Sequence, residues 1–245
     1  MKNDISISIA DQVINESQSE KILGIIMNNE MTFRSHLHRN DENEGLIQQL
    51  SKRAGIIGKL ARYISPGNFK SFVAGIFYSK ISYCLPLYGN VFGLEKYRDN
   101  TTKYINYTVR DNNKLQVLQN KINRILIRSK FGTSTSDLLM MTKSLSIQQM
   151  IALQTLVLTF KIIQTSKPSY LANKLRFDMR KQNLRSKAVT LKLTQYKLNQ
   201  SREGFINRGI TLFNRLDEET RRSGSLPVFE KAARKWVLDN IKIKP

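Results

Sequence analysis

The chain has 245 residues, of which 40% are hydrophobic and 24% charged, a composition typical of a globular protein. One cysteine, Cys84, and two histidines, His36 and His38, exclude a disulfide framework and any multi-cysteine zinc or iron–sulfur site. The net charge of +21 favours a polyanionic partner, because self-repulsion at such a charge opposes compaction.

The basic residues are unevenly distributed. Residues 51–130 carry 15 basic and 3 acidic side chains, residues 171–245 carry 18 and 7, and residues 1–50 carry 4 and 8. An ordinary solvated helix surface mixes both signs. We therefore expect residues 51–130 to contact nucleic acid, with simple solvation of exposed helix faces as the alternative.

No targeting segment is recognisable in the sequence. The first twelve residues lack the long apolar region of a secretory signal. The most apolar stretch, residues 147–163, is interrupted by polar residues and is shorter than the roughly 20 residues of a membrane span. We expect an intracellular protein, nuclear or cytoplasmic, with no membrane partner.

Residues 1–45 predict a small β element and a connector. Alternation of Ile5, Ile7 and Ile9 with small residues indicates a half-buried strand, and Val13 begins a return strand. The apolar run at residues 21–27 predicts one further strand, in which Gly24 permits close backbone approach. These are too few strands to be stable alone.

Residues 46–130 predict basic helices. An apolar stripe with helical spacing covers residues 46–64, and Ser65-Pro66 starts a second helix that ends before Pro86. Residues 94–112 are polar without a stripe and predict a loop. Helix resumes over residues 114–129.

Residues 131–245 predict a C-terminal helical region. Capping-box patterns after Ser134 and Ser146 each start a helix, and the second, at residues 147–164, is apolar on more than one side. A short strand is predicted at residues 189–193, a short helix at 209–216, and a final helix capped by Ser225, with Trp236 in its core face. The predicted fold is mainly α, a helical bundle with a small N-terminal β element.

Two helix faces are candidate nucleic-acid-binding sites. The first comprises Lys52, Lys59 and Arg62, which fall within a sector of about 80°. The second comprises Lys114, Lys121 and Arg128, seven residues apart, together with Arg124, about 60° from Lys121. Tyr63 and the phenylalanines of residues 69–77 lie among these cations, where base stacking is possible; the helical spacing of the phenylalanines favours core packing instead. The scattered carboxylates and histidines predict no catalytic residue and no metal ligand.

Several short motifs occur in a fixed order along the chain. They are Lys21-Ile-Leu-Gly-Ile25 with Met31-Thr-Phe33 and His36; Leu60-x-x-Tyr63 with Ser65-Pro66 and Tyr83-Cys84-x-Pro-x-Tyr88-Gly89; Leu115-Gln-Val-Leu-Gln-Asn-Lys-Ile-Asn-Arg-Ile125; Leu145-Ser-Ile147 with Phe160-Lys161 and Pro168-Ser-Tyr-Leu171; and Arg208-Gly209 with Leu212-Phe-Asn-Arg-Leu216 and Ser225-Leu-x-x-Phe229. The ordered set resembles the thumb and post-thumb region of a non-LTR (LINE-type, jockey-like) retrotransposon reverse transcriptase. Phe33 and Phe213 stand where that family has Trp, and Asp217 where it has Pro.

The resemblance implies part of an RNA-directed DNA polymerase. The family's thumb helices track the template–primer duplex, and Lys52, Lys59 and Arg62 match that position. Its palm binds Mg²⁺ through an aromatic-Ala-Asp-Asp turn, whereas this sequence contains no Asp-Asp pair. We therefore expect a detached, catalytically incomplete C-terminal region that uses no cofactor and binds RNA, DNA or their hybrid.

Two alternatives stay open at the level of sequence. The chain would be an interaction module that completes a reverse transcriptase palm in trans, with the apolar side of residues 1–33 as the contact. Otherwise it would be an inert transposon remnant.

Overall fold

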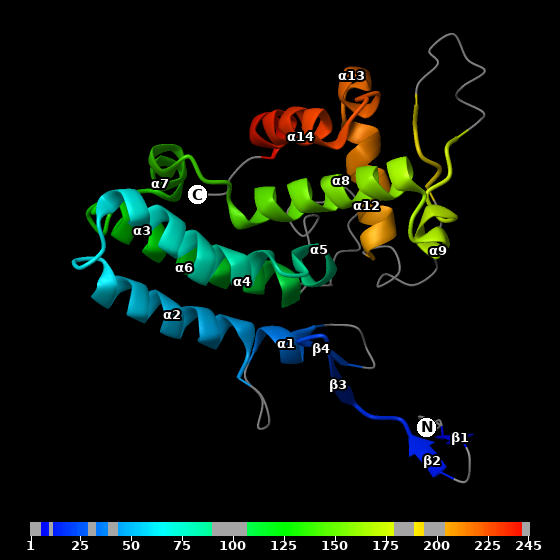
Figure 1. Ribbon diagram of the computed structural model, residues 1–245, viewed down its shortest axis with the longest axis horizontal. Coiled ribbons are helices and arrows are strands. Elements are labelled where there is room, and N and C mark those ends of the chain that lie inside the picture. The colour runs from blue at the N-terminus through cyan, green and yellow to red at the C-terminus, as the bar shows by residue number, and fades with distance from the viewer. Residues whose placement is uncertain are drawn as a thin grey trace, which may run out of the picture. The chain divides into compact units, whose positions relative to one another are not determined.

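The computed structural model describes residues 6–9, 12–28, 33–38, 44–89, 107–178, 189–193 and 204–241 (Figure 1). They divide into two compact units, residues 1–51 and residues 52–245, with the boundary inside helix α2 (Leu46–Leu60). The described chain is mainly helical with small two-stranded sheets near its N-terminus, which confirms the predicted fold class.

The first unit contains two antiparallel hairpins. Strands β1 (Ser6–Ile9) and β2 (Gln12–Asn15) form one, as the alternation predicted. Strands β3 (Ser19–Ile22) and β4 (Ile25–Asn28) form the other. A short helix, α1 (Arg34–Leu37), contacts β4.

The single strand predicted at residues 21–27 is therefore wrong. Leu23 and Gly24 both have positive φ, 49° and 83°, and form the two-residue turn between β3 and β4. Such a turn matches the twist of a hairpin and favours glycine at a left-handed position. Gly24 thus reverses the chain, and an added Cβ would meet no atom within 4 Å, so no backbone approaches it closely.

After α2, the second unit contains a helix with a π-helical turn. Helices α3 (Pro66–Val73) and α4 (Ser79–Ser82) are joined without a break by η1 (Ala74–Tyr78). Phe69 and Phe77 are buried on this helix, which confirms core packing for both. A short helix, α5 (Leu85–Tyr88), follows, so Pro86 lies in the first turn of a helix and not in a loop.

Helix α6 spans Tyr107–Ile127. The predicted loop over residues 94–112 is therefore wrong at its C-terminal end, and residues 94–106 lie outside the described part of the chain. Residues 107–112 contain neither Gly nor Pro, and extending an existing helix costs little once its first turn has formed. The two additional turns need no apolar stripe of their own for that reason.

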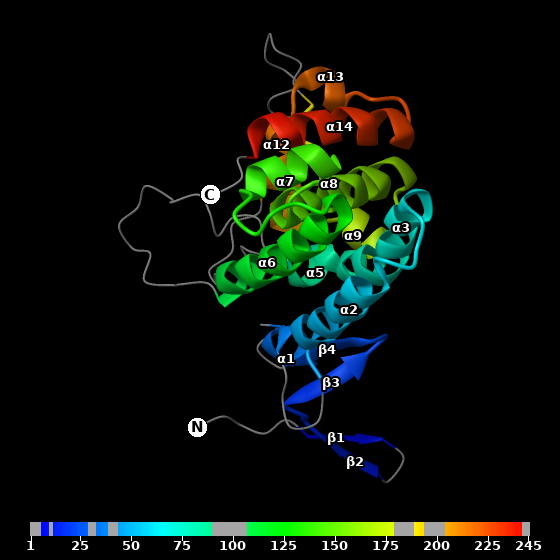
Figure 2. The same ribbon diagram turned by 90° about the vertical axis from the view of Figure 1, so that its left-hand side faces the viewer.

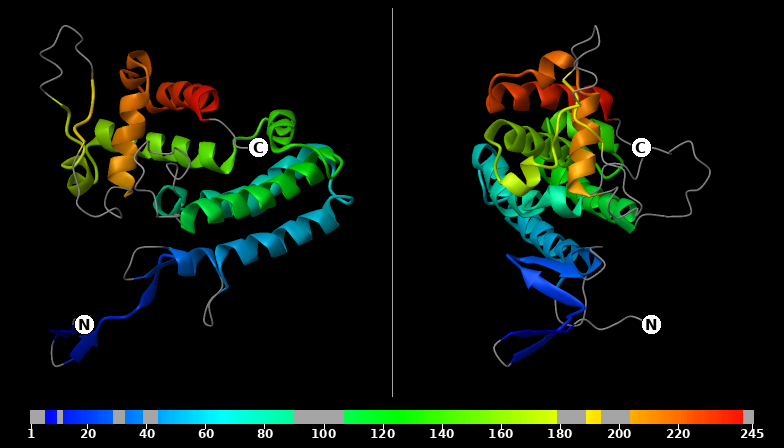
Figure 3. Two further views of the ribbon diagram at one scale, coloured as in Figure 1. Left: turned by 180° about the vertical axis from the view of Figure 1, so that it is seen from behind. Right: turned by 90° about the vertical axis from the view of Figure 1, so that its right-hand side faces the viewer.

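Helix α8 (Ile147–Thr165) forms the centre of the second unit. It contacts α5, α6, α9 (Ser169–Ala172), α12 (Phe205–Arg215) and α14 (Leu226–Asn240). Figure 2 shows α14 over α8, and Figure 3 shows α12 crossing α8 steeply. Its apolar residues face several neighbours at once, which is why its sequence is apolar on more than one side.

Both predicted capping boxes begin helices. The Ser134 side chain accepts the backbone N–H of Asp137 at the start of α7 (Thr135–Thr142). Ser146 and Gln149 bond reciprocally at the start of α8, at 3.2 and 3.0 Å. Each cap satisfies backbone donors that a helix leaves free at its N-terminus.

The C-terminal helices pack through stacked aromatic rings. The centroids of Phe160 and Phe229 are 4.0 Å apart, and Phe213 lies 6.5 Å from Phe229.

Trp236 is only partly buried, so its prediction as a core residue is wrong. Residues 189–193 contribute a single bridge, Phe177 to Leu191, and not the strand predicted there.

Among the described residues, no single helix has both the length and the apolar character needed to cross a membrane. Helices α7 and α8 meet that requirement only as a pair, with a 53° bend between them.

Candidate nucleic-acid interface

The first predicted face lies on α2 and on the turn after it, which carries Arg62. Lys52, Lys59 and Arg62 are all exposed, whereas Ala54 and Ile57 on the other side of the helix are completely buried. At 1.5 Å per residue, the three cations extend over about 15 Å. They therefore form one solvent-facing basic row, which we call the α2 face.

An exposed aromatic ring extends the α2 face. The Tyr63 side chain is 77% exposed, and the guanidinium carbon of Arg62 lies 5.8 Å from its ring centroid. A ring and a cation side by side are the groups that stack on bases and contact phosphates in single-stranded nucleic acid. Tyr63 thus differs from the buried Phe69 and Phe77.

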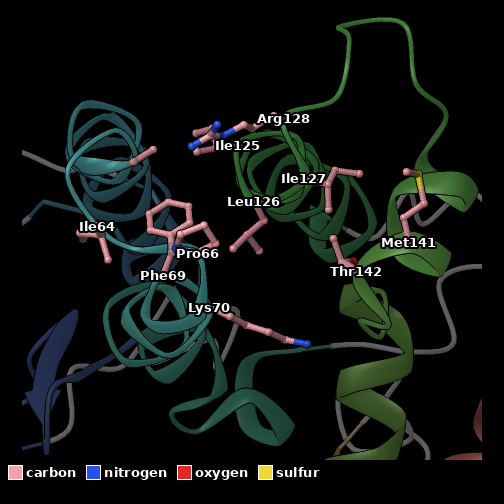
Figure 4. A pocket seen from close by; sticks show the side chains of 11 residues that line it. Ile64, Pro66, Phe69, Lys70, Ile125, Leu126, Ile127, Arg128, Met141 and Thr142 are labelled. Atoms are coloured by element: carbon pink, nitrogen blue, oxygen red, sulfur yellow. The ribbon is translucent and has the colours of Figure 1, made fainter.

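The second predicted set does not form one surface. Lys114 and Lys121 are exposed along α6, with the 66% exposed Val117 between them in sequence. Arg128 is exposed at the end of α6, about 21 Å from Lys114 along the axis, and has a left-handed φ of 51°. Its side chain points toward the C-terminal end of α2 (Figure 4). Arg128 therefore lies near the C-terminal end of α2, and Lys114 lies apart from it.

Arg124 binds its own loop. Its Nη2 donates a hydrogen bond to the carbonyl of Thr133 at 3.1 Å, and its guanidinium lies 5.4 Å from the ring centroid of Phe131. Nε is buried. These contacts connect the end of α6 to the segment before α7, so Arg124 is positioned as a structural cross-link.

Arg53 is a similar cross-link that sequence analysis missed. It lies on α2, and its Nη1 donates to the carbonyl of Ile76 at 2.6 Å, within the π turn η1. A π turn interrupts the i+4 pairing of a helix, so its carbonyls are natural acceptors for a neighbouring side chain. No local sequence signal marks that acceptor.

The most specific motif, residues 115–125, supplies a buried polar face. Gln119 and Asn123 are completely buried and Asn120 nearly so. Two side chains of this helix donate hydrogen bonds: Gln119 Nε2 to the carbonyl of Leu145 (2.8 Å) and Asn120 Nδ2 to Thr135 Oγ1 (2.7 Å). Two others accept: Asn123 Oδ1 from Tyr78 Oη (2.9 Å) and Gln116 Oε1 from the Ile147 N–H (3.0 Å). The motif joins α6 to η1, α7 and α8.

Burial also affects the tyrosines of this region. Removal from water raises the pKa of Tyr78, an effect partly opposed by its hydrogen bond with Gln119. Burial likewise raises the pKa of Tyr88, whose hydroxyl donates to the carbonyl of Ile81. Both phenols are therefore held in the neutral form.

The motif at residues 208–216 is structural as well. Arg208 is buried, and its Nη2 donates to the carbonyl of Pro86. The Asn214 side chain bonds both backbone groups of Leu191, at 2.7 and 2.8 Å. Asp217, where the family has Pro, caps α13 (Glu218–Arg221) by accepting from Thr220, and that backbone bond lowers its pKa.

Acidic residues are missing from the segments that carry the candidate cations. Residues 52–89 contain six basic and no acidic side chains, and residues 112–136 contain five and none. Among the described residues, no cluster of three or more His, Cys, Asp or Glu side chains could hold a metal ion. The exposed cations on these surfaces attract anions.

No protein-family model, curated protein or solved structure matches this chain. The resemblance to reverse transcriptases rests on the sequence motifs, several of which form structural contacts in the second unit.

Proposed function

We propose that this chain is a thumb-like, nucleic-acid-binding part of a non-LTR retrotransposon reverse transcriptase, with RNA, DNA or their hybrid as partner. The observation that carries the proposal is the α2 face: Lys52, Lys59 and Arg62 lie in one exposed row, with Arg128 pointing toward its end. No acidic residue occurs in the segments that form it. Such a row attracts phosphates whatever the base sequence.

The size of the α2 face suits a duplex backbone. A row of about 15 Å covers roughly four nucleotide steps at 3.4 Å per step of one strand. Lysine and arginine contact phosphates without a cofactor, and sequence is read only when side chains reach base edges. The proposed activity is binding in the nucleus or cytoplasm, where these partners occur; polymerisation is not assigned to this chain.

The test compares two basic helix faces of equal charge. Lys52, Lys59 and Arg62 are replaced by Gln in one variant, and the exposed Lys231, Arg234 and Lys235 of α14 are replaced by Gln in the other. Fluorescence anisotropy with a labelled RNA–DNA hybrid should show at least about a tenfold loss of affinity for the α2 variant, because phosphate contacts supply most of non-specific binding. The α14 variant should stay within about twofold. Equal losses would contradict the proposal.

A second candidate is docking of the first unit onto another β-sheet, such as a reverse transcriptase palm supplied in trans. It is favoured by the exposed apolar side chains of the two hairpins, Ile7, Val13, Ile22 and Leu23. A two-stranded hairpin has unpaired edges that accept further strands. Charged replacements at Ile7 and Val13 that leave co-purification with such a palm unchanged would eliminate this candidate.

A further inference from the structure

A small groove opens where the ends of α2 and α6 meet the start of α3 and the end of α7. Its volume is about 220 Å³, and its walls include Ile64, Pro66, Leu126 and Met141, with Lys70 and Arg128 among the lining residues. Figure 4 shows the two cations on opposite sides of the apolar side chains. We call this site the α7 groove.

The lining combines an apolar floor with positive charge only. Thr142 is its one uncharged polar side chain, and no carboxylate lines it. The walls from α2, α3 and α6 lie within residues 52–89 and 112–136, which contain no acidic residue, and Asp137 of α7 is not among the lining residues. A ligand that buries an apolar group here would place its neighbouring groups beside Lys70 and Arg128, so negative groups are complementary at those positions.

Exposed apolar side chains also occur next to Met141 in α7 and in the segment before α7. Met141 is 58% exposed, Met140 is 73% exposed and Phe131 is 91% exposed. Methionine side chains are flexible and polarizable, and they are common at surfaces that bind amphipathic helices. The groove and this surface together provide one recessed anchor site and an apolar border.

We infer that the α7 groove binds a helical peptide segment of a partner protein, with one apolar anchor residue in the cavity and acidic residues flanking it. A cavity of about 220 Å³ is smaller than the roughly 300–1,000 Å³ of small-molecule sites and accommodates a side chain. A nucleic-acid base is disfavoured, because Phe69, the lining residue with an aromatic ring, is only 6% exposed and leaves little surface for stacking. The inference stands independently of the proposed nucleic-acid binding, although Arg128, which lines the groove, also points toward the end of α2.

The experiment uses the full chain and a synthetic fluorescent helical peptide that carries one Phe anchor, flanking Glu residues and Ala elsewhere. Two control peptides carry Ser in place of Phe, or Lys in place of Glu. The Phe–Glu peptide should bind saturably. Both controls should bind at least about tenfold more weakly, because one lacks the apolar anchor residue and the other lacks the acidic residues that flank it.

Two neighbouring methionines provide matched variants. Met141→Glu introduces a negative charge into the α7 groove, and Met140→Glu introduces the same charge next to it, outside the lining. Both residues are exposed, so both variants should fold, as circular dichroism will verify. Peptide affinity should fall at least about tenfold for Met141→Glu and less than about threefold for Met140→Glu.

Four outcomes would overturn the inference. The first two are absence of binding by the Phe–Glu peptide and equal effects of the two methionine variants. The third is a loss of duplex DNA binding by Met141→Glu as large as its loss of peptide binding, which would make the groove part of the nucleic-acid surface. The fourth is self-association of the chain that Met141→Glu abolishes, which would make a second copy the occupant.

Discussion

Basic residues in this chain differ in what their side chains contact. Arg53, Arg124 and Arg208 each donate to a backbone carbonyl, whereas Lys59 on α2 and Arg62 in the turn after it are exposed. Arginine suits the first role because its planar guanidinium presents several donors in fixed directions. The positive charge of residues 51–130 is therefore partly structural, and a count of cations overstates the binding surface.

Replacement of Arg124 by Gln should lower the free energy of unfolding by about 2 kcal/mol, because it removes the bond to Thr133 and the contact with Phe131. Lys121→Gln, on an exposed position of the same helix, should change it by less than about 0.5 kcal/mol. Urea denaturation of both variants measures the difference. Equal stabilities would mean that Arg124 is only a solvated side chain.

At the residue scale, helical periodicity predicted which cations lie outside the core. Lys52, Lys59 and Arg62 are exposed as their common sector required. The role of Arg124 could not be predicted, because its acceptor lies in a loop whose return toward α6 is a tertiary feature. The same reason applies to Arg53 and the π turn.

At the scale of elements, α12 packs against α8 at a distance that only glycine permits. A Cβ on Gly209 would collide with the Thr159 hydroxyl. Gly209→Ala should therefore lower the free energy of unfolding by about 1–3 kcal/mol, despite the better helix propensity of Ala. Thermal or urea denaturation of the variant and the wild type measures this change in the free energy of unfolding.

Two further variants isolate the collision. Combining Gly209→Ala with Thr159→Ala should recover part of the loss, because the added methyl group then has space. Gly55→Ala, where an added Cβ meets no atom within 4 Å, should instead stabilise the protein by about 0.5–1 kcal/mol. Additive effects of the first two substitutions would disprove close packing at this crossing.

Burial of the α6 polar face leads to a prediction about alkaline pH. Because the pKa of Tyr78 is raised by burial, the folded protein keeps its phenol protonated at a pH where the unfolded chain has lost that proton. Folding then binds protons, so stability should fall as the pH rises above about 10. Tyr88 adds to the same trend.

Tyr78→Phe tests this directly. At pH 8 it should cost about 1–3 kcal/mol, because the buried Asn123 loses its hydrogen bond. Between about pH 9 and pH 11 the stability of the variant should fall less steeply than that of the wild type, because the variant lacks the Tyr78 phenol, whose pKa is raised in the folded protein. Urea midpoints measured across this range would refute the burial argument if both proteins lost stability in parallel.

Among elements, strong local signals were predictive and weak ones were not. Capping boxes and apolar periodicity located the starts of α7 and α8. The β3–β4 turn was missed because Leu23 is an unusual residue at positive φ. The strand predicted at 189–193 failed because Asn214, a side chain, occupies the backbone groups of Leu191 that a neighbouring strand would use.

At the scale of the whole chain, the two units carry opposite charge. Residues 1–51 hold 4 basic and 8 acidic side chains, and residues 52–245 hold 36 and 11. The first unit presents two-stranded hairpins with Ile7 and Val13 exposed, whereas α8 in the second unit is largely buried. Their local stabilities should differ accordingly.

Native-state hydrogen exchange should show this difference. Amides of β1 and β2 should exchange fastest among the described elements, and those of Ile151–Phe160 in α8 slowest, because protection follows the burial of the surrounding side chains. Mass spectrometry of peptic fragments resolves both regions. Protection of the β1–β2 hairpin equal to that of α8 would require a stable core around the hairpin.

The proposed binding surface is most directly tested by the salt dependence of duplex affinity. If about five phosphates are contacted, log K against log salt should have a slope near −4.5 for B-DNA. Replacing Lys52, Lys59 and Arg62 by Gln should make the slope shallower by about 2.7, and the same change at Lys231, Arg234 and Lys235 should leave it unchanged. Identical slopes for the two variants would contradict a specific role of the α2 face.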